Sequence, residues 1–499
     1  MGQTSATEKS YLITFFRSLG MVVTVIIPMV LSRILDIEVF GSYKQITGLT
    51  MAMLFLLELG SDASLYYFST RDPKRHFLYS FLVTAFTAGV ALLVSAIILL
   101  TREQIATFLG NPDFARVAVP FCLGFATMLA SRHLESYLIY IDRIRAVILL
   151  ETGLNAGKAV VIIGGFYYLE SFAAVLYGLA ILYLFPLGWL LTYDGRRLLA
   201  TPIGPGEYRR VIGAMLRYGL PTGLKNIASY VRHLHQLFVS VVFGIKQLAF
   251  YSVGCLELPV ITYLSSTFIT VASVDLMKAR DSGKPGAFEA IFRHALNKIY
   301  MLQVPVIVFL MVYADLIITF LYSDAFAPAV LFFQIYYTGK LLAPEAPDIL
   351  FYALEKPGLL FRVELAITTL FMAGMALSMS LDARYAMAAF SLTSVLGVVL
   401  KLGVLRHKCH LAVSRLIPLG NLATYGLISA TVALLLRAGG GPLALPKFLE
   451  IGLGLGLYTV ALALVFWHAG LIGKEEKRYL TAKGRLLKQR LLPAGSDAS

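Results

Sequence analysis

The sequence predicts an all-α polytopic membrane protein with about fourteen transmembrane helices. Hydrophobic residues make up 58% of the chain and charged residues only 14%, a balance far from that of soluble globular proteins. Apolar blocks of about 20 residues recur along the whole length, and each could cross a hydrocarbon core of roughly 30 Å as a helix. Basic residues gather after every second block, as expected for a chain that crosses a membrane repeatedly.

The predicted spans follow the apolar blocks in order, and their ends vary by several residues. The first block continues into a full-length span without a small-residue cleavage site, so we expect a retained helix rather than a removed signal peptide. The spans are expected at residues 10–34, 45–69, 77–100, 115–140, 146–168, 171–193, 213–243, 249–275, 289–320, 327–352, 359–380, 384–405, 412–437 and 446–469.

The net charge of +14 follows the predicted loops, so we interpret it as a membrane pattern and expect no nucleic-acid partner. By the positive-inside rule, the basic connections and both termini are predicted to be cytoplasmic. An odd number of helices would break this alternation, so the charges support fourteen spans independently of hydropathy. The basic residues after even-numbered spans are Arg71, Lys74, Arg75, Arg143, Arg145, Arg196, Arg197, Arg209, Arg210, Lys278, Arg280, Lys284, Lys356, Arg406, Lys408 and Arg415.

The longest polar interruption, "YDGRRLLATPIGPGEYRR" at 193–210, divides the chain. The segment after it echoes the beginning of the chain. In both, a basic residue beside an aromatic one precedes a long span, and a short polar stretch then leads into a helix that starts with aromatic residues. This echo predicts two pseudo-symmetric six-helix lobes followed by two extra helices. The expected units are an N-terminal lobe at 1–195, a cytoplasmic linker at 196–212, a C-terminal lobe at 213–405, two helices at 406–470 and a basic cytoplasmic tail at 471–499.

Four phrases carry a resemblance to a known family: "LSRILDIEVFGSYKQITGL", "LELGSDASLYYFS", "LRYGLPTGL" and "ADLIITFLYSDAFAPAVLFFQIYY". They resemble the polysaccharide-transporter branch of the multidrug/oligosaccharidyl-lipid/polysaccharide (MOP) exporter superfamily, and in particular the Wzx-type flippases. The resemblance runs in order from about residue 10 to 440. It implies two lobes around a central cavity and alternating access in a bacterial inner membrane. The implied substrate is an undecaprenyl-pyrophosphate-linked oligosaccharide, with membrane lipids and the polysaccharide polymerase and ligase machinery as further partners.

The seventh predicted span is amphipathic on a helical wheel. Lys225 and Arg232, seven positions apart, fall on nearly the same side, because a helix advances about 100° per residue. A polar half within a span must face water or a partner, and a basic cavity wall suits a lipid-linked pyrophosphate. The predicted substrate-binding residues of this span are Lys225, Asn226, Ser229, Arg232, His233, His235 and Gln236.

An alternative is that these basic residues only pair with buried acids and hold the lobes together; Glu58, Asp62 and Glu257 are the acids considered. Arg17, at the corresponding place in the first lobe, either faces the same cavity or extends to lipid headgroups.

Other charged residues predicted inside the membrane form three short-range pairs. Arg132 and Glu135, three apart, are expected to neutralise each other as a structural pair. The other two pairs, Glu58 with Asp62 and Glu345 with Asp348, are candidates for coupling transport to a proton or sodium gradient, with pairing to basic residues as the alternative for the first.

We expect a transporter rather than an enzyme, with no cofactor and no metal. The chain shows no nucleophile elbow, phosphate loop or metal-ligand cluster, and little of it lies outside the predicted spans. The alternatives are a cation-coupled drug or small-molecule antiporter of the same superfamily, a membrane glycosyltransferase or ligase, and a scaffold or lipid scramblase. An antiporter of cations would need an acidic cavity, whereas the polar face of the seventh span is basic.

Overall fold

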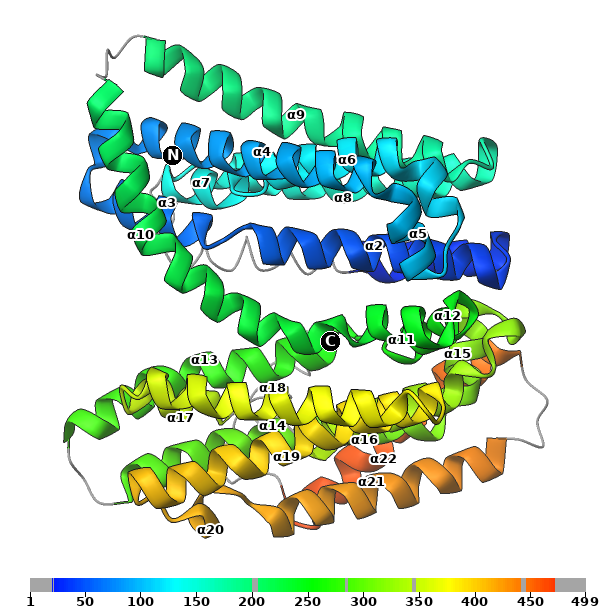
Figure 1. The fold of residues 1–499 in the computed structure, drawn as a ribbon. Coiled ribbons are helices and arrows are strands. Elements are labelled where there is room, and N and C mark those ends of the chain that lie inside the picture. Colours follow the sequence, from blue (N-terminus) through cyan, green and yellow to red (C-terminus); the bar gives the residue numbers. More distant parts are fainter. Residues whose placement is uncertain are drawn as a thin grey trace, which may run out of the picture.

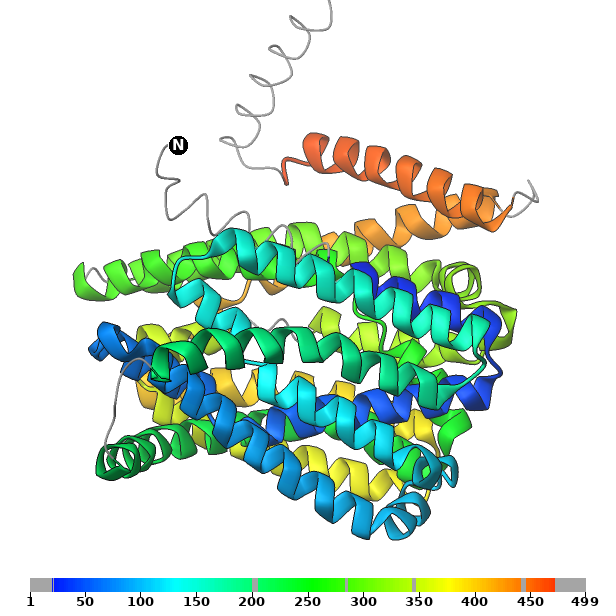
Figure 2. The ribbon, with the colours of Figure 1, turned by 90° about the horizontal axis from the view of Figure 1, so that it is seen from above.

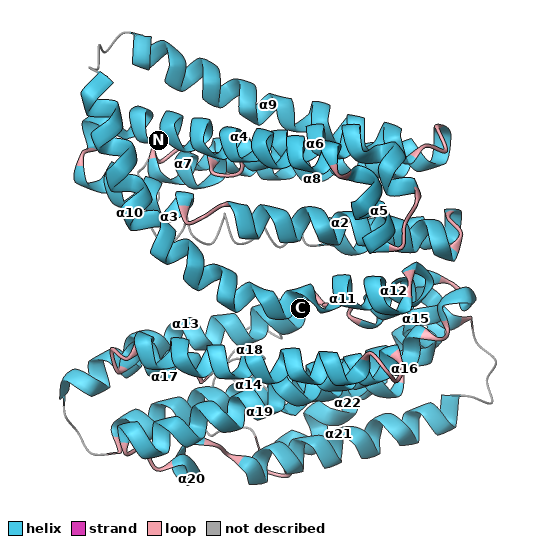
Figure 3. Ribbon diagram, in the orientation of Figure 1, coloured by secondary structure: helices cyan, strands magenta, loops and turns pink. Residues whose placement is uncertain are grey.

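The secondary structure of the protein is helical throughout the described part of the chain (Figure 3). The computed structural model describes residues 20, 22–199, 205–282, 286–342, 347–440 and 446–471. No strand occurs in these ranges, which confirms the all-α fold class. The long helices form two bundles that lie side by side (Figure 1).

The first bundle contains the apolar helices of the N-terminal part. Its longest uninterrupted apolar helix, α4, has 25 residues with no Asp, Glu, Lys or Arg, as a membrane-crossing helix requires. A short apolar helix, Val22–Ile34, precedes the labelled elements. These are α2 (Ile37–Leu57), α3 (Ser61–Arg71), η1 (Pro73–Arg75), α4 (His76–Leu100), α5 (Arg102–Leu109), α6 (Asp113–Ser131), α7 (Leu134–Tyr140), α8 (Ile144–Tyr168) and α9 (Phe172–Leu199).

The second bundle begins after α10, a helix that crosses from the first bundle toward the second in Figure 1. The elements are α10 (Pro205–Tyr230), η2 (Val231–Leu234), α11 (His235–Phe243), α12 (Ile245–Gly254), α13 (Pro259–Ser282), α14 (Ala287–Val312), α15 (Ala314–Tyr322), η3 (Asp324–Phe326), α16 (Ala329–Leu342), α17 (Asp348–Ala353), α18 (Pro357–Ser378), α19 (Ala383–Cys409), α20 (Val413–Leu416), α21 (Leu419–Gly440) and α22 (Lys447–His468).

Among the described residues, fewer helices have the length and hydropathy of a membrane span than the fourteen predicted. Within the described ranges, nine helices are long and apolar enough to cross a membrane, and the bent pair α2–α3 makes ten. The predicted count of fourteen is therefore not confirmed. Several of the predicted spans are interrupted, among them those at the α2–α3, α10–α11, α12–α13 and α16–α17 junctions.

The second predicted span, 45–69, breaks between Leu57 and Ser61. Leu59 and Gly60 adopt left-handed backbone angles, with φ of 50° and 74°, which end one helix and redirect the next. A Cβ on Gly60 would lie 2.2 Å from the carbonyl oxygen of Gly219 on α10, so only glycine fits this crossing. Glu58 and Asp62 consequently do not share one continuous helical face, as their spacing had predicted.

The seventh predicted span also breaks, because α10 ends at Tyr230 and a 3₁₀ turn, η2, separates it from α11. A 3₁₀ turn has 3.0 residues per turn rather than 3.6 and so rotates the side chains after it. A single helical wheel through Lys225 and Arg232 therefore does not describe the residues after Tyr230, Arg232 included.

The predicted linker at 196–212 is largely helical, since α9 extends to Leu199 and α10 starts at Pro205. The lobe boundaries remain predictions. The last two helices, α21 and α22, pack on α14 and α15, and Figure 2 shows α22 set apart from the main body of the molecule. Most of the tail at 471–499 lies outside the described residues.

One end of the molecule, hereafter the basic end, collects most of the positively charged connections. The α3–α4, α7–α8 and α17–α18 connections and the end of α9 lie there, on the left in Figure 1. These are connections that the positive-inside rule assigned to the cytoplasm. The orientation in the membrane remains a prediction.

Candidate functional site

Four charged side chains, two of them buried and two partly exposed, form a chain of ion pairs within the second bundle. The guanidinium of Arg232, on η2, donates to Glu364 Oε2 of α18 at 2.7 Å. The other oxygen of this carboxylate lies 2.6 Å from the ammonium of Lys401 on α19, which also lies 2.6 Å from Asp348 Oδ1 at the start of α17. We call these four residues the charge chain.

The charge chain is neutral, with two cations and two carboxylates. The side chains of Glu364 and Lys401 are only 10% exposed, and that of Arg232 is 26% exposed. Removing charges from water costs several kcal/mol per ion unless each one is paired. Each member therefore depends on its neighbour, and the helix break at η2 brings Arg232 within reach of the α18 carboxylate.

Glu364, the acid that pairs with Arg232, was not among the partners predicted from the sequence. Glu257, one of the predicted partners, instead accepts a hydrogen bond from Tyr336 Oη at 2.6 Å and lies 3.3 Å from Lys340. A signal for Glu364 was present, because it is the one acid in a mostly apolar predicted span, 359–380, whose only basic residue is Arg362.

A second ion pair joins helices of the first bundle. Arg132 Nε donates to Glu58 Oε2 at 2.9 Å, which links the end of α6 to the end of α2. The guanidinium also lies 4.6 Å from the ring centroid of Phe55, and that ring stacks on Tyr230 of α10 at 4.3 Å. This cluster connects the first bundle to α10 two residues before Arg232. The pairing of Arg132 with Glu135 stays a prediction.

The remaining acids and histidines are dispersed. Asp62 accepts a hydrogen bond from Ser136 Oγ at 3.1 Å. His235 is 5% exposed, shares a 2.7 Å hydrogen bond with Tyr251 Oη and stacks on Phe390, so it belongs to the core in this conformation. His233 is exposed and Gln236 half-buried, both beside the η2 break.

Several predicted site residues cannot be placed. Arg17 and Glu345 lie outside the described residues. Lys225, Asn226 and Ser229 lie on α10, but their side chains are not described. Among the described residues, no group of three or more His, Cys, Asp or Glu side chains could hold a metal ion.

At the end opposite the basic end, the two bundles are in contact. A Cβ on Gly41 of α2 would lie 2.4 Å from the carbonyl oxygen of Ile245 on α12, so the two backbones touch. Arg33 donates to the carbonyl oxygen of Leu321 at 2.9 Å and to that of Phe320, at the end of α15. These contacts close this end in the present conformation.

A buried amide cluster supports the same closure. Gln45 of α2 donates to Ser240 Oγ of α11 at 3.2 Å and to the carbonyl oxygen of Leu109 at 2.7 Å. It accepts from Asn111 Nδ2 at 2.9 Å. Buried amides need such partners, so opening this end exposes groups that must find water instead.

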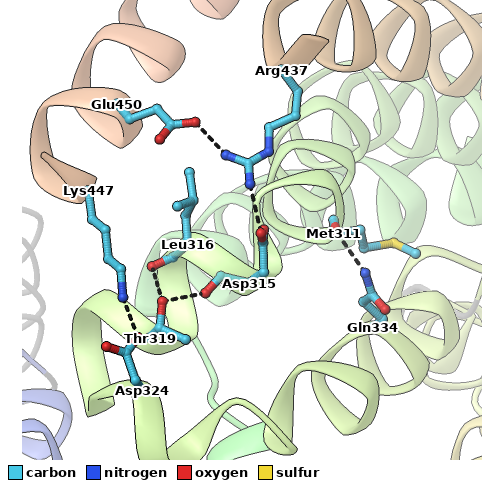
Figure 4. Close-up of polar contacts among 9 residues, drawn as sticks. All are labelled: Met311, Asp315, Leu316, Thr319, Asp324, Gln334, Arg437, Lys447 and Glu450. Carbon is cyan, nitrogen blue, oxygen red and sulfur yellow. Dashed lines mark hydrogen bonds and ion pairs between the residues drawn. The ribbon is translucent and has the colours of Figure 1, made fainter. Parts of the chain in front are cut away.

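Charged side chains fasten the last two helices to the second bundle at this end (Figure 4). Arg437 of α21 lies 2.5 Å from Glu450 of α22 and 2.7 Å from Asp315 of α15. Lys447, at the start of α22, pairs with Asp324 of η3. The pairs of Arg437 with Asp315 and of Lys447 with Asp324 meet the segment 314–326, which also contacts Arg33 and, through Phe326, Phe40 of α2.

The long apolar helices of the described ranges are those of a multi-pass membrane protein, and a comparison with known proteins identifies its family. The sequence model of the family described as "Polysaccharide biosynthesis protein" matches residues 30–331. The chain belongs to this family. A comparison with curated protein sequences finds no match.

Solved structures show the same fold at low sequence identity. The lipid II flippase MurJ, in an inward closed conformation, aligns with a TM-score of 0.72 and 11% identity, covering 92% of this chain and 99% of that one. An inward-facing multidrug resistance MATE transporter of the MOP superfamily aligns with a TM-score of 0.58 and 12% identity, covering 80% of this chain and 95% of that one. A MOP superfamily transporter from Pyrococcus furiosus aligns with a TM-score of 0.53 and 13% identity, covering 83% of this chain and 99% of that one.

Proposed function

We propose that this protein is a flippase that moves a polyprenyl-pyrophosphate-linked oligosaccharide repeat unit from the inner to the outer leaflet of a bacterial cytoplasmic membrane. The observation that carries the proposal is Arg232 at a helix break, 26% exposed and held by a single carboxylate. Membership of a polysaccharide biosynthesis family and the likeness to a lipid II flippase support a lipid-linked sugar as the substrate.

Arg232 can bind pyrophosphate by exchanging one anion for another. Its planar guanidinium forms two parallel hydrogen bonds to phosphate oxygens as readily as to a carboxylate. When Arg232 turns to the substrate, Glu364 keeps Lys401 as its partner, so the acid is not left alone in the protein interior. The substrate thus competes with Glu364 for the same cation.

The side chains around Arg232 supply the rest of the site. Lys225 adds a second positive charge for pyrophosphate, and the hydroxyl and amide groups of Ser229, Asn226 and Gln236 suit sugar hydroxyls. Arg17 and His233 are further proposed contacts. His235 would require a rearrangement of its core packing to contribute.

Transport proceeds by alternating access in this proposal. The N-terminal lobe at 1–195 and the C-terminal lobe at 213–405 rock against each other, and the contacts of Gly41, Gln45 and Arg33 break as the outer side opens. Both termini are then cytoplasmic, and the flipped lipid is passed to polymerase and ligase machinery.

A proton or sodium gradient is the proposed energy source, with Glu58, Asp62, Glu345 and Asp348 as candidates. Glu58 and Asp348 each lie beside a cation, Arg132 and Lys401, in this conformation. A coupling ion would therefore bind only after one of these pairs has separated.

The test is a leaflet-resolved inventory of lipid-linked oligosaccharides in cells that lack the protein. Wild-type complementation should remove a cytoplasmic-side accumulation of complete repeat units, and Arg232→Ala at equal protein level should not. Arg116→Gln, in an exposed pair with Asp113, is the matched control and should behave as wild type. An unchanged inventory in the deletion strain would overturn the proposal and favour a drug or cation antiporter.

A further inference from the structure

A cavity of about 280 Å³ lies between α3, α4 and α10, apart from the charge chain. Its walls are mostly aliphatic or aromatic. Two serines, Ser61 and Ser64, also line it, and the Ser64 hydroxyl already donates to the carbonyl oxygen of Met215 at 3.1 Å. A cavity lined in this way suits hydrocarbon rather than water or sugar. The apolar lining residues are Leu59, Leu82, Val83, Phe86, Met215 and Leu216.

The cavity reaches the surface of α4, where its lining residue Ala85 is exposed. Gly89, Leu92 and Ala96 follow it at helical spacing on the same exposed face. Leu92 is 66% exposed. An exposed stripe with no polar side chain on a membrane-crossing helix borders hydrocarbon, so a lipid chain can enter sideways from the bilayer.

Basic side chains stand close to the cavity, toward the basic end. Arg209 and Arg210 of α10 are exposed and precede the lining residue Ile212 by one helical turn or less. Lys74, just before α4, is exposed as well. The cavity begins about 10 Å along α4 from this end, at 1.5 Å per residue, which is the distance from a headgroup to its acyl chain.

We propose that this cavity binds one acyl chain of an anionic phospholipid, whose phosphate contacts Arg209 and Arg210. The juxtaposition of an apolar cavity at acyl-chain depth with exposed arginines at headgroup depth carries the inference. The bound lipid lies against the α10 face that crosses the α2–α3 break at Gly219. It therefore supports the tilt of the helix that leads to Arg232.

The experiment counts lipids bound to the full-length protein by native mass spectrometry during titration with phosphatidylglycerol or with phosphatidylcholine. Wild type should hold one phosphatidylglycerol at least about tenfold more tightly than phosphatidylcholine. Ala85→Phe, which fills the opening, should remove this tight site for both lipids. Arg209→Gln with Arg210→Gln should keep a bound lipid but lose the preference for the anionic one.

Matched controls separate the site from general effects on the surface. Ala96→Phe enlarges the same exposed face of α4 three turns away, and Arg406→Gln with Lys408→Gln removes the same charge from α19. Both should bind as wild type. The proposal is overturned if Ala85→Phe retains the tight lipid, if both double variants change the preference equally, or if polyprenyl pyrophosphate alone fills the site. These readouts measure binding and do not depend on transport.

Discussion

The guanidinium of Arg232 and the carboxylate of Glu364 lie 2.7 Å apart, although 132 positions separate them in the sequence. Their contact joins the only 3₁₀ turn between α10 and α11 to a long helix of the second bundle. An anionic ligand can bind Arg232 only by displacing Glu364, because this carboxylate occupies the position that a phosphate oxygen would take.

Glu364→Gln should strengthen binding of a polyprenyl pyrophosphate by about tenfold, since the neutral amide competes less well for Arg232. Lys401 keeps its contact with Asp348 in this variant. Isothermal titration or fluorescence quenching with the lipid in micelles measures the change, and Arg232→Ala supplies the opposite direction. Unchanged or weaker binding in Glu364→Gln would show that the two anions do not compete.

The stability of the protein should depend on the net charge of the charge chain rather than on the number of ion pairs in it. Lys401→Met leaves two carboxylates for one arginine and should destabilise the protein by about 3 kcal/mol. Adding Asp348→Asn restores neutrality, and the double variant should recover part of this loss. Denaturant unfolding in detergent measures both, and a double variant at least as unstable as the sum of the single ones would contradict the prediction.

Gly223→Ala should disturb the crossing of α10 over the α2–α3 break. A Cβ at this position would lie 2.5 Å from the carbonyl carbon of Leu59, and backbone atoms cannot move aside cheaply. Gly213→Ala on the same helix meets nothing within 4 Å and should stabilise the protein by about 0.5–1 kcal/mol, because alanine favours a helix over glycine. Equal melting temperatures for the two variants would refute this account.

Gly41→Ala should hold the two bundles apart at the end opposite the basic end. The added Cβ would lie 2.4 Å from the Ile245 carbonyl oxygen, whereas Gly48→Ala on the same helix meets only a side chain at 3.6 Å. Spin labels at Glu38→Cys and Lys246→Cys, both exposed positions, should therefore move apart in Gly41→Ala and not in Gly48→Ala. Identical distance distributions would mean that the contact does not control closure.

The two ion pairs that fasten α21 and α22 should differ in strength. Arg437 and Glu450 are 27% and 17% exposed, while Lys447 and Asp324 are 39% and 83% exposed. Solvent weakens the second pair to less than about 1 kcal/mol. Arg437→Gln should thus lower the thermal stability more than Lys447→Gln. The reverse order would show that solvent exposure does not determine the relative strength of these two ion pairs.

Sequence periodicity identified most of the helices because their apolar character is continuous. The block at 77–100 coincides with α4 and the block at 384–405 lies within α19. Periodicity failed at Gly60 and at Val231–Leu234, where helices break. Such breaks depend on what packs against the turn, here the Gly219 backbone for Gly60, and no window of local sequence contains that partner.

The site was predicted in part. The sequence singled out Arg232 as a charge that must face water or a partner, because an unpaired cation within a span is costly, and its role in substrate binding stays a prediction. Its partner was missed, as was Lys401, which bridges two acids. Glu58 was predicted either to form an acidic pair with Asp62 or to pair with a basic residue, and it contacts Arg132, 74 positions away.

The sequence by itself determined the membrane class, the helical architecture and the family, because hydropathy, charge alternation and ordered motifs are properties of the chain read in one dimension. Tertiary structure alone decided which charge meets which, how α10 crosses the first bundle and which end is closed. Those outcomes depend on contacts between residues far apart in the sequence, such as Glu58 with Arg132 at 74 positions and Arg232 with Glu364 at 132, and the free energy of a buried charge is set by its neighbours in space.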